Sequence, residues 1–268
     1  MVNIKKFIKI PILTFILSPK LFFLEVKRRI FGKPYCYNGF KVENASQFGF
    51  LFYLLLRKAK FKNNILYING LKFFASDIRY LLATVFEEEA HKLKEYKLSE
   101  NEIKGKRVLD VGAYIGDTVI GFVKKGAKYV IGYEPVFYDI AIKNLKLNKI
   151  KNAKIIPYGV SDRKKVIYAK FEYAGTGLHK GKDVKIVCIA WKEVLKDKFD
   201  IAKVDCEGCE FSLLNVNKKL LRKIPLWLIE IHGNPYLLIK HFENAGFKAE
   251  KIYTHDKNIT IWKFELIK

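Results

Sequence analysis

The chain contains 268 residues, of which 50% are hydrophobic and 15% aromatic, and its formal net charge is +23. This length suits one large domain or a medium domain with a smaller appendage, and the apolar content excludes wholesale disorder. The charge excess favours weak attraction to polyanions and anionic membranes, but it identifies no binding site.

Residues 1–31 interleave apolar and aromatic side chains with lysine and arginine. Their longest apolar run, residues 10–17, is interrupted by Pro11 and Thr14 and precedes no small-residue cleavage site, unlike a signal peptide. It is also shorter than the roughly 20 residues that cross a bilayer. Two interpretations remain open: an amphipathic helix on a membrane surface, or a helix that packs on the rest of the protein. We expect a cytoplasmic protein, with peripheral membrane contact through residues 1–31 as one alternative.

The rest of the first hundred residues is mostly typical of helix. Broad apolar periodicity predicts helices over residues 45–61 and 76–96. Between them, residues 64–76 alternate in polarity around Asn69-Gly70, a dipeptide typical of a two-residue β-hairpin turn. Residues 1–95 are therefore predicted to form a mainly helical N-terminal cap region.

Residues 96–268 alternate regularly between strand and helix patterns. Predicted strands cover residues 107–111, 129–133, 153–158, 166–171, 184–189, 201–205, 226–231, 247–253 and 258–265. Predicted helices cover residues 117–125, 136–147, 191–195, 210–215 and 235–245. Such alternation is typical of a parallel sheet with helices on both faces.

The last two predicted strands are joined by too few residues for a crossover helix, so we expect them to form a hairpin that makes the final strand antiparallel. The predicted fold class is therefore α/β, a Rossmann-like doubly wound, mostly parallel sheet over residues 96–268 that ends in an antiparallel hairpin.

The stretch "RVLDVGAYIGDT", residues 107–118, turns a predicted strand into a predicted helix. Gly112 and Gly116 bracket this turn, where glycine lets the backbone approach a bound group closely. Their spacing is neither the GxGxxG fingerprint of dinucleotide sites nor the nucleoside triphosphate loop. The next strand ends at Glu134, whose carboxylate could accept both hydrogen bonds of a ribose diol, as in sites for NAD or S-adenosylmethionine. The glycine spacing favours S-adenosylmethionine.

Four blocks of sequence then resemble the FkbM family of S-adenosylmethionine-dependent methyltransferases. They are "VLDVGAYIGDTVIGFVKKGAKYVIGYEPVFYDIAIKNLKLN", "IIPYGVSD", "IAKVDCEGCEFSLL" and "LWLIEIHG", in the order expected for the family. The similarity runs from about residue 105 to the C-terminus, and residues 1–95 lie outside it. The resemblance implies a class I methyltransferase fold, S-adenosylmethionine as cofactor, and most often methylation of a hydroxyl on a sugar or secondary metabolite.

The resemblance also implies residues for the methyl donor. Asp110, Gly112 and Gly116 match the loop around the amino acid part of S-adenosylmethionine, and Glu134 matches the ribose-binding acid. Tyr114 stands where the family usually has Asn, so we include it with the cofactor residues and expect its contact to be remade or lost.

The remaining matches concern the adenine side and the acceptor. Ser161 and Asp162 fall where the family's third strand leads into an adenine-side loop. Lys203, Asp205, Glu207 and Gly208 match the family's K-D-x-E-G block, which faces the methyl group and the acceptor.

A hydroxyl acceptor benefits from a base or a metal ion that takes up its proton. Glu207 or His232 is the preferred general base, with Asp205 beside them, although for His232 the pattern favours a structural histidine at a strand end over a catalytic one. Asp205 and Glu207 as a metal pair would favour a hard cation such as Mg²⁺. The sequence shows no third ligand, so no metal site is predicted.

Cys206 and Cys209 form a CxxC pair that lacks the second pair or histidines of a zinc site. They fill variable positions of the family's block, which favours packing residues over metal ligands or a redox pair. The Gly-rich segment 173–183 is equally suited to a lid over the substrate and to a turn between strands.

Two functions follow as hypotheses. The first is an S-adenosylmethionine-dependent O-methyltransferase that acts on a glycan, a lipid-linked sugar or a small metabolite. The alternative is an RNA methyltransferase that uses the basic surface, although nucleic acid is the less favoured partner because no regular aromatic spacing accompanies the cations.

Overall fold

The computed structural model describes residues 13–38, 40–74, 93–170, 179–180, 184–255 and 257–267. Most of the predicted helix 76–96 and of the segment 173–183 lies outside these ranges. The chain divides into two compact units, Met1–Ile78 and Arg79–Lys268. The domain boundary that the sequence suggests near residue 95 stays a prediction.

The first unit combines the helices α2 and α3 with two small antiparallel sheets, and the described residues 13–17 before α2 are helical as well. Its elements are α2 (Pro19–Phe31), β1 (Tyr35–Tyr37), β2 (Phe40–Val42), α3 (Ala45–Leu56), β3 (Lys60–Lys62), β4 (Ile65–Ile68) and β5 (Leu71–Phe74). Both helices begin at a side-chain cap, since Ser18 accepts from the N–H of Leu21 and Asn44 from that of Gln47. The predicted hairpin is confirmed: β4 and β5 pair around Asn69 and Gly70.

One prediction for this unit changes. The helix expected over residues 45–61 ends at Leu56, because Lys58 adopts a left-handed φ of 54° that an α-helix does not continue. Among the described residues, the helices are too short or too polar to traverse a bilayer.

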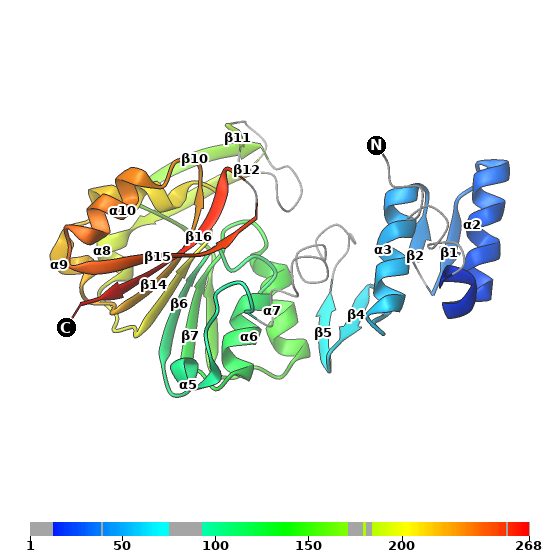
Figure 1. Ribbon diagram of the computed structural model, residues 1–268, viewed down its shortest axis with the longest axis horizontal. Coiled ribbons are helices and arrows are strands. Elements are labelled where there is room, and N and C mark those ends of the chain that lie inside the picture. The colour runs from blue at the N-terminus through cyan, green and yellow to red at the C-terminus, as the bar shows by residue number, and fades with distance from the viewer. Residues whose placement is uncertain are drawn as a thin grey trace. The chain divides into compact units, whose positions relative to one another are not determined.

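The second unit is built on a seven-stranded sheet in the order β15-β16-β14-β13-β6-β7-β8 (Figure 1). Its strands are β6 (Arg107–Val111), β7 (Tyr129–Tyr133), β8 (Ala153–Ile156), β13 (Ile201–Val204), β14 (Leu226–His232), β15 (Phe247–Thr254) and β16 (Ile259–Leu266). Neighbours pair in parallel except β16, which is antiparallel to both β14 and β15. The predicted fold class and its closing hairpin are confirmed.

Helices cover both faces of this sheet (Figure 1). They are α5 (Glu100–Ile103), α6 (Asp117–Lys124), α7 (Tyr138–Leu147), α8 (Trp191–Val194), the 3₁₀ helix η3 (Cys209–Asn215), α9 (Lys218–Leu221) and α10 (Tyr236–Glu243). Residues of α8, η3, α9 and α10 share one hydrophobic cluster with alternate residues of the strands. The helices α6 and α7 contact each other and the strands β7 and β8.

A second, four-stranded sheet corrects one expectation. The strands β9 (Gly159–Ser161), β10 (Lys165–Lys170), β11 (His179–Lys180) and β12 (Val184–Ala190) pair in the order β11-β10-β12-β9. The predicted strands 166–171 and 184–189 therefore leave the main sheet. They pair with each other in antiparallel fashion, as strands without a crossover helix between them do.

Candidate functional site

The strands β6, β13 and β14 bring their polar residues to one face and one end of the sheet. Successive side chains of a strand point to opposite faces. Leu109, Ala202 and Ile229 belong to the hydrophobic cluster beneath α8 and α10. Asp110 and Lys203, which are direct partners in the β6–β13 register, therefore point to the other face.

The same alternation sends Glu230 and His232 of β14 to that face. Lys203 pairs with Leu228 in the parallel register, and Val204 pairs with Ile229. Continuing this register by one residue places Asp205 beside Glu230. The sheet itself thus assembles the charged residues from three neighbouring strands.

Gly112 makes this close assembly sterically feasible. A Cβ on Gly112 would lie 1.7 Å from the backbone oxygen of Asp205, so only glycine fits between the ends of β6 and β13. The ammonium of Lys203 donates to the Gly112 carbonyl at 2.8 Å. The loop after β6 and the loop after β13 are therefore in direct backbone contact.

Lys203 and Asp110 form a buried ion pair. The Lys203 Nζ lies 3.2 Å from Asp110 Oδ1 and 3.4 Å from Asp205 Oδ2. Asp110 also accepts from the Thr118 hydroxyl at 2.5 Å, which ties β6 to α6. Burial opposes the charged form of Lys203, but the Asp110 and Asp205 carboxylates outweigh it and raise the pKa of Lys203 above its usual value.

Glu134 holds the glycine loop in shape. Its carboxylate accepts from the backbone N–H of Tyr114 at 2.9 Å, of Val136 at 2.7 Å and of Phe137 at 3.0 Å. Burial raises the pKa of Glu134 even though these three N–H groups favour the charged form. Because a carboxylate offers about four acceptor positions, one remains for a ribose hydroxyl.

Three residues of the loop have left-handed backbone conformations. Gly112 and Gly116 both have φ of 82°, and Tyr114 has φ of 46°, which is uncommon for a residue with a side chain. The bond from the Tyr114 N–H to Glu134 and the edge-to-face contact of its ring with Phe137 hold this conformation. Both glycines allow close protein contacts, Gly112 with the Asp205 backbone and Gly116 with the Leu145 side chain, and the role of the loop in cofactor binding stays a prediction.

Ser161 and Asp162 lie on and just after β9 of the second sheet. The Ser161 hydroxyl hydrogen-bonds Asp162 at 2.9 Å, and Asp162 pairs with Lys165. Within the described residues, the hydrogen bonds and the ion pair of these side chains join Ser161, Asp162 and Lys165. Their assignment to the adenine side stays a prediction.

The loop after β13 carries two consecutive left-handed residues, Glu207 with φ of 56° and Gly208 with φ of 106°. A disulfide joins Cys206 to Cys209 across them. The expectation that these cysteines are packing residues is confirmed, since both pack against the hydrophobic core, and the disulfide between them is an addition that the sequence did not predict. The disulfide closes a tight loop that presents the Glu207 side chain, which is 30% exposed.

His232 lies at the centre of a group of carboxylates. Its Nδ1 lies 3.2 Å from Glu210 Oε1, and its Nε2 lies 3.4 Å from both Glu207 Oε2 and Glu230 Oε1. Burial disfavours the charged imidazolium, but the hydrogen bonds to Glu210 and Glu230 and the nearby charges raise the pKa of His232 to about 11. His232 thus carries its proton at neutral pH and is poorly suited to act as a free base.

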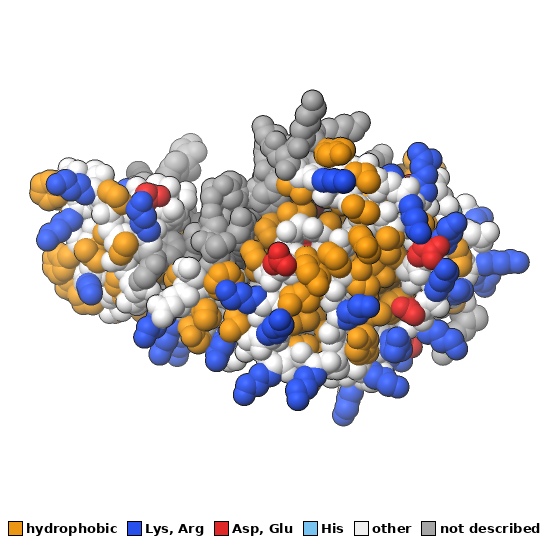
Figure 2. Space-filling view, turned by 180° about the vertical axis from the view of Figure 1, so that it is seen from behind, with side chains coloured by type: hydrophobic (Ala, Val, Ile, Leu, Met, Phe, Trp, Pro, Cys, Tyr) orange, Lys and Arg blue, Asp and Glu red, His pale blue; other side chains and the backbone are white. Residues whose placement is uncertain are grey.

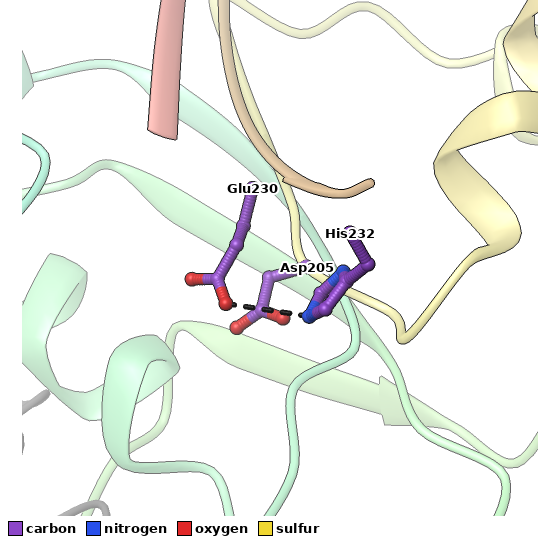
Figure 3. Close-up of side chains that lie close together, drawn as sticks. All are labelled: Asp205, Glu230 and His232. Atoms are coloured by element: carbon purple, nitrogen blue, oxygen red, sulfur yellow. Dashed lines mark ion pairs between the residues drawn. The ribbon is translucent and has the colours of Figure 1, made fainter. Parts of the chain in front are cut away.

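Asp205, Glu230 and His232 converge on one point (Figure 3). One ligand atom from each lies within 4.8 Å of the other two, an arrangement that could hold a metal ion. Burial and the Glu230 carboxylate raise the pKa of Asp205. Burial would raise the pKa of Glu230 too, but hydrogen bonds from His232 and His255 lower it.

The sequence showed no third ligand beside Asp205 and Glu207, whereas the structure places Glu230 and His232 beside Asp205. The signal for Glu230 was present, since it is an acid in an otherwise apolar strand, two residues before His232 and thus on the same face. His255 of the segment after β15 contacts Glu230 at 3.4 Å and was likewise not assigned.

Glu95 also belongs to this region and was not predicted. It is 7% exposed. Burial, and then repulsion from Asp205 and Glu230, raise the pKa of Glu95 to about 8. In the sequence, residue 95 stands near the end of a predicted helix. No local sequence pattern places it near Asp205 and Glu230, which are more than a hundred residues away in the chain.

Comparisons with known proteins identify a family model and a sequence relative. The model of the methyltransferase FkbM domain family matches residues 110–249. Protein 158B of Sulfolobus islandicus rod-shaped virus 1 is 28% identical over 138 residues, which cover 52% of this chain and 68% of that protein.

Two solved structures are similar in fold. The methyltransferase FkbM of Methylobacillus flagellatus superposes with a TM-score of 0.47 at 15% identity, covering 71% of this chain and 55% of that chain. The present chain thus spans about half of that protein. The precorrin-6y C5,15-methyltransferase of Geobacter metallireducens has a TM-score of 0.43 at 14% identity, covering 69% of this chain and 91% of that chain.

Proposed function

The chain belongs to the FkbM methyltransferase family, and on this premise we propose that it methylates a hydroxyl group of a glycan, a lipid-linked sugar or a small metabolite. The family and the fold make it an S-adenosylmethionine-dependent methyltransferase. The hydroxyl acceptor, the small-molecule or glycan partner and the residue roles below are the proposal.

The donor side consists of the loop after β6 and the end of β7. Asp110, Gly112, Tyr114 and Gly116 would hold the amino acid part of S-adenosylmethionine, and Glu134 its ribose. Ser161 and Asp162 would lie toward the adenine. The bound cofactor supplies a methyl group on a positively charged sulfur, so the protein mainly has to align donor and acceptor.

The observation that carries the hydroxyl acceptor is the group of acid–base residues directly beside the glycine loop. A hydroxyl must lose a proton as its oxygen bonds to the methyl carbon. Glu207 is 30% exposed and lies on a rigid loop that the Cys206–Cys209 disulfide closes, so we assign it as the base that takes this proton. His232, which holds its own proton, contacts Glu207 and steadies its carboxylate, while Asp205 lines the acceptor side.

The alternative substrate is RNA, because the chain carries a net charge of +23. On the face in Figure 2, lysine and arginine are scattered around hydrophobic side chains and are not gathered into one continuous stripe. That distribution favours general attraction to anions over a built nucleic-acid groove.

A peripheral membrane contact of residues 1–31, in a cytoplasmic protein, completes the proposal. Exposed apolar side chains of this segment support it, namely Leu13, Phe15, Ile16, Leu17, Phe23, Ile30 and Phe31. Side chains of this kind next to lysine and arginine suit the interface of an anionic bilayer. Wild-type protein should cosediment with anionic vesicles. The Ile30→Ser, Phe31→Ser double variant should not. Equal pelleting of both proteins would contradict the contact.

The test of the donor site is calorimetric titration with S-adenosylmethionine. Glu134→Gln replaces one of the two oxygens that accept from three backbone N–H groups with an NH₂ donor, and it should weaken binding at least tenfold, about 1.4 kcal/mol. Glu243→Gln, at an exposed position of α10, is the matched control and should bind as wild type. Wild-type protein that is folded but does not bind the cofactor would overturn the proposal.

The test of the acceptor chemistry is transfer of radiolabelled methyl to a panel of glycans, hydroxylated metabolites and RNA. Glu207→Gln should lower the turnover with the accepted hydroxyl compound by roughly 100-fold or more, with cofactor affinity unchanged, because only proton removal is lost. Transfer to RNA alone would replace the proposal with its alternative.

A further inference from the structure

Three side chains beside the proposed acceptor site offer a ligand set from two adjacent strands. Asp205 follows β13, and Glu230 and His232 lie two residues apart on β14. Their ligand atoms lie within 4.8 Å of one another (Figure 3). The side chains are 30%, 13% and 16% exposed, in that order, so solvent ions can reach them.

The buried Glu210 carboxylate orients the imidazole of His232. The Glu210 carboxylate is fully buried and accepts from the His232 backbone N–H at 2.9 Å and from the Gly208 N–H at 2.8 Å. Since a carboxylate only accepts hydrogen bonds, the Nδ1 at 3.2 Å from it carries the hydrogen. Nε2 is thereby turned toward Glu230 and Asp205. Metal-binding histidines are commonly oriented by a carboxylate on the other ring nitrogen in this way.

A second observation, independent of these contacts, is the position of Glu95. It is 7% exposed, and among the described residues no group donates a hydrogen bond or an ion pair to its carboxylate. The charges that act on it most strongly are those of Asp205 and Glu230. A buried acid next to two further acids stays protonated at neutral pH, and a cation bound nearby would allow it to ionise.

The charges around this point are unbalanced toward the negative. Glu95, whose pKa is about 8, is protonated at neutral pH, so the charged groups are the carboxylates of Asp205, Glu207, Glu210 and Glu230 and the cations His232 and Lys203. Lys203 also neutralises Asp110, which leaves the carboxylates in excess. The excess attracts a cation, and the strand register fixes where it would bind.

We propose that Asp205, Glu230 and Nε2 of His232 bind one divalent cation of the Mg²⁺ or Mn²⁺ type. Two carboxylates and one imidazole suit such a cation, which would complete its coordination with water. On binding, the Nε2 proton of His232 passes to solvent and the metal takes its place. The cation's role rests on the proposed function: it would hold the acceptor hydroxyl oxygen and lower its pKa, so that Glu207 removes the proton.

The experiment uses Mn²⁺ as probe, with the free ion measured by electron paramagnetic resonance during titration of chelator-treated full-length protein. Wild type should bind one Mn²⁺ per chain, and Mg²⁺ should compete. Asp205→Asn and Glu230→Gln should weaken binding at least tenfold. Glu210→Gln should weaken it about 10–100-fold through the orientation of His232. Glu250→Gln, which removes one exposed charge from β15, is the matched control.

Wild-type protein that binds no Mn²⁺ at millimolar concentration would overturn the inference, and so would equal binding by wild type and both ligand variants. Preferential binding of Zn²⁺ with no competition by Mg²⁺ would overturn the assigned cation class. Because wild type alone decides the first outcome, a variant that fails to fold does not block the test.

Calorimetry with S-adenosylmethionine on the same metal-free protein separates the two proposals. Cofactor binding without Mn²⁺ binding removes the cation site and leaves the proposed function intact. Mn²⁺ binding without cofactor binding would overturn the proposed function and leave the cation site intact.

Discussion

Gly112 and Lys203 show how much of this site depends on single residues. The Lys203 ammonium is buried between Asp110 and Asp205 and donates to the Gly112 carbonyl. A Cβ on Gly112 would overlap the Asp205 backbone oxygen at 1.7 Å. The conformation of the proposed cofactor loop and the position of Asp205 are therefore set by the same few atoms.

Gly112→Ala should lower cofactor affinity by more than tenfold and reduce the melting temperature. The substitution meets two costs: a left-handed φ of 82° and a backbone collision that forces β6 and β13 apart. Gly105→Ala is the control, because its φ is 77° but a Cβ there meets nothing within 4 Å. It should cost about 1–2 kcal/mol and leave cofactor affinity unchanged. Thermal unfolding and calorimetric titration measure both quantities, and equal effects of the two variants would refute the steric argument.

The sequence predicted the places of several individual residues in the fold and missed those of others for physical reasons. Asp110, Gly112 and Glu134 stand at strand ends, where a local pattern of strand and turn identifies them. Glu95 and Glu230 acquire their roles through strand pairing and burial, which no local pattern records. The Cys206–Cys209 disulfide depends on the geometry of a left-handed turn, and the CxxC spacing alone did not distinguish it from packing.

At the level of elements, α2 shows how ion pairs within a short amphipathic helix stabilise it. Glu25 is 4% exposed and accepts from Arg28 at 2.7 and 2.8 Å and from Arg29 at 2.8 Å. Burial alone would raise the pKa of Glu25, but the hydrogen bonds from the two arginines outweigh it and lower the pKa. The ionised carboxylate therefore stabilises the folded helix.

The pH dependence follows from this lowered pKa. The stabilisation by Glu25 is present above its ordinary value of 4.5 and is lost as the pH falls through the lower pKa of the folded state. At about pH 7, Glu25→Gln should cost roughly 1.5–3 kcal/mol, the usual worth of hydrogen bonds to a charged group. The deficit should shrink toward about pH 3. Circular dichroism during thermal unfolding follows it, with the exposed Glu43→Gln as control; a deficit that grows in acid would contradict the assignment.

Strands were predicted correctly where one or both of their faces are buried. The apolar strands β6, β7, β13 and β14 and the closing hairpin of β15 and β16 follow directly from their sequence patterns. The strands β10 and β12 show the same alternation, yet they form a separate sheet. A strand pattern reports which face is buried but not which sheet provides the neighbour, so this difference could not be read from the sequence.

For the whole molecule, the net charge of +23 is the property most relevant to partners. Dispersed cations, as on the face in Figure 2, attract polyanions without selecting among them. Such attraction releases counterions and falls steeply with salt.

Binding to unrelated RNA sequences should therefore be similar in strength at about 50 mM salt and should fall by at least tenfold at about 200 mM. Fluorescence anisotropy with two labelled RNAs of different sequence measures this. A strong preference for one sequence that persists at the higher salt would favour the RNA methyltransferase over the proposed O-methyltransferase.

The missing side chain at Gly112 has a thermodynamic consequence as well. The loop after β6 and the loop after β13 are in direct backbone contact at Gly112. Ordering one of these loops therefore requires ordering the other. Two ligands that each stabilise one of these loops are then linked, and linkage is reciprocal. Whatever factor the cation adds to the affinity for S-adenosylmethionine, the cofactor must add to the affinity for the cation, and the enzyme would assemble its reactants cooperatively.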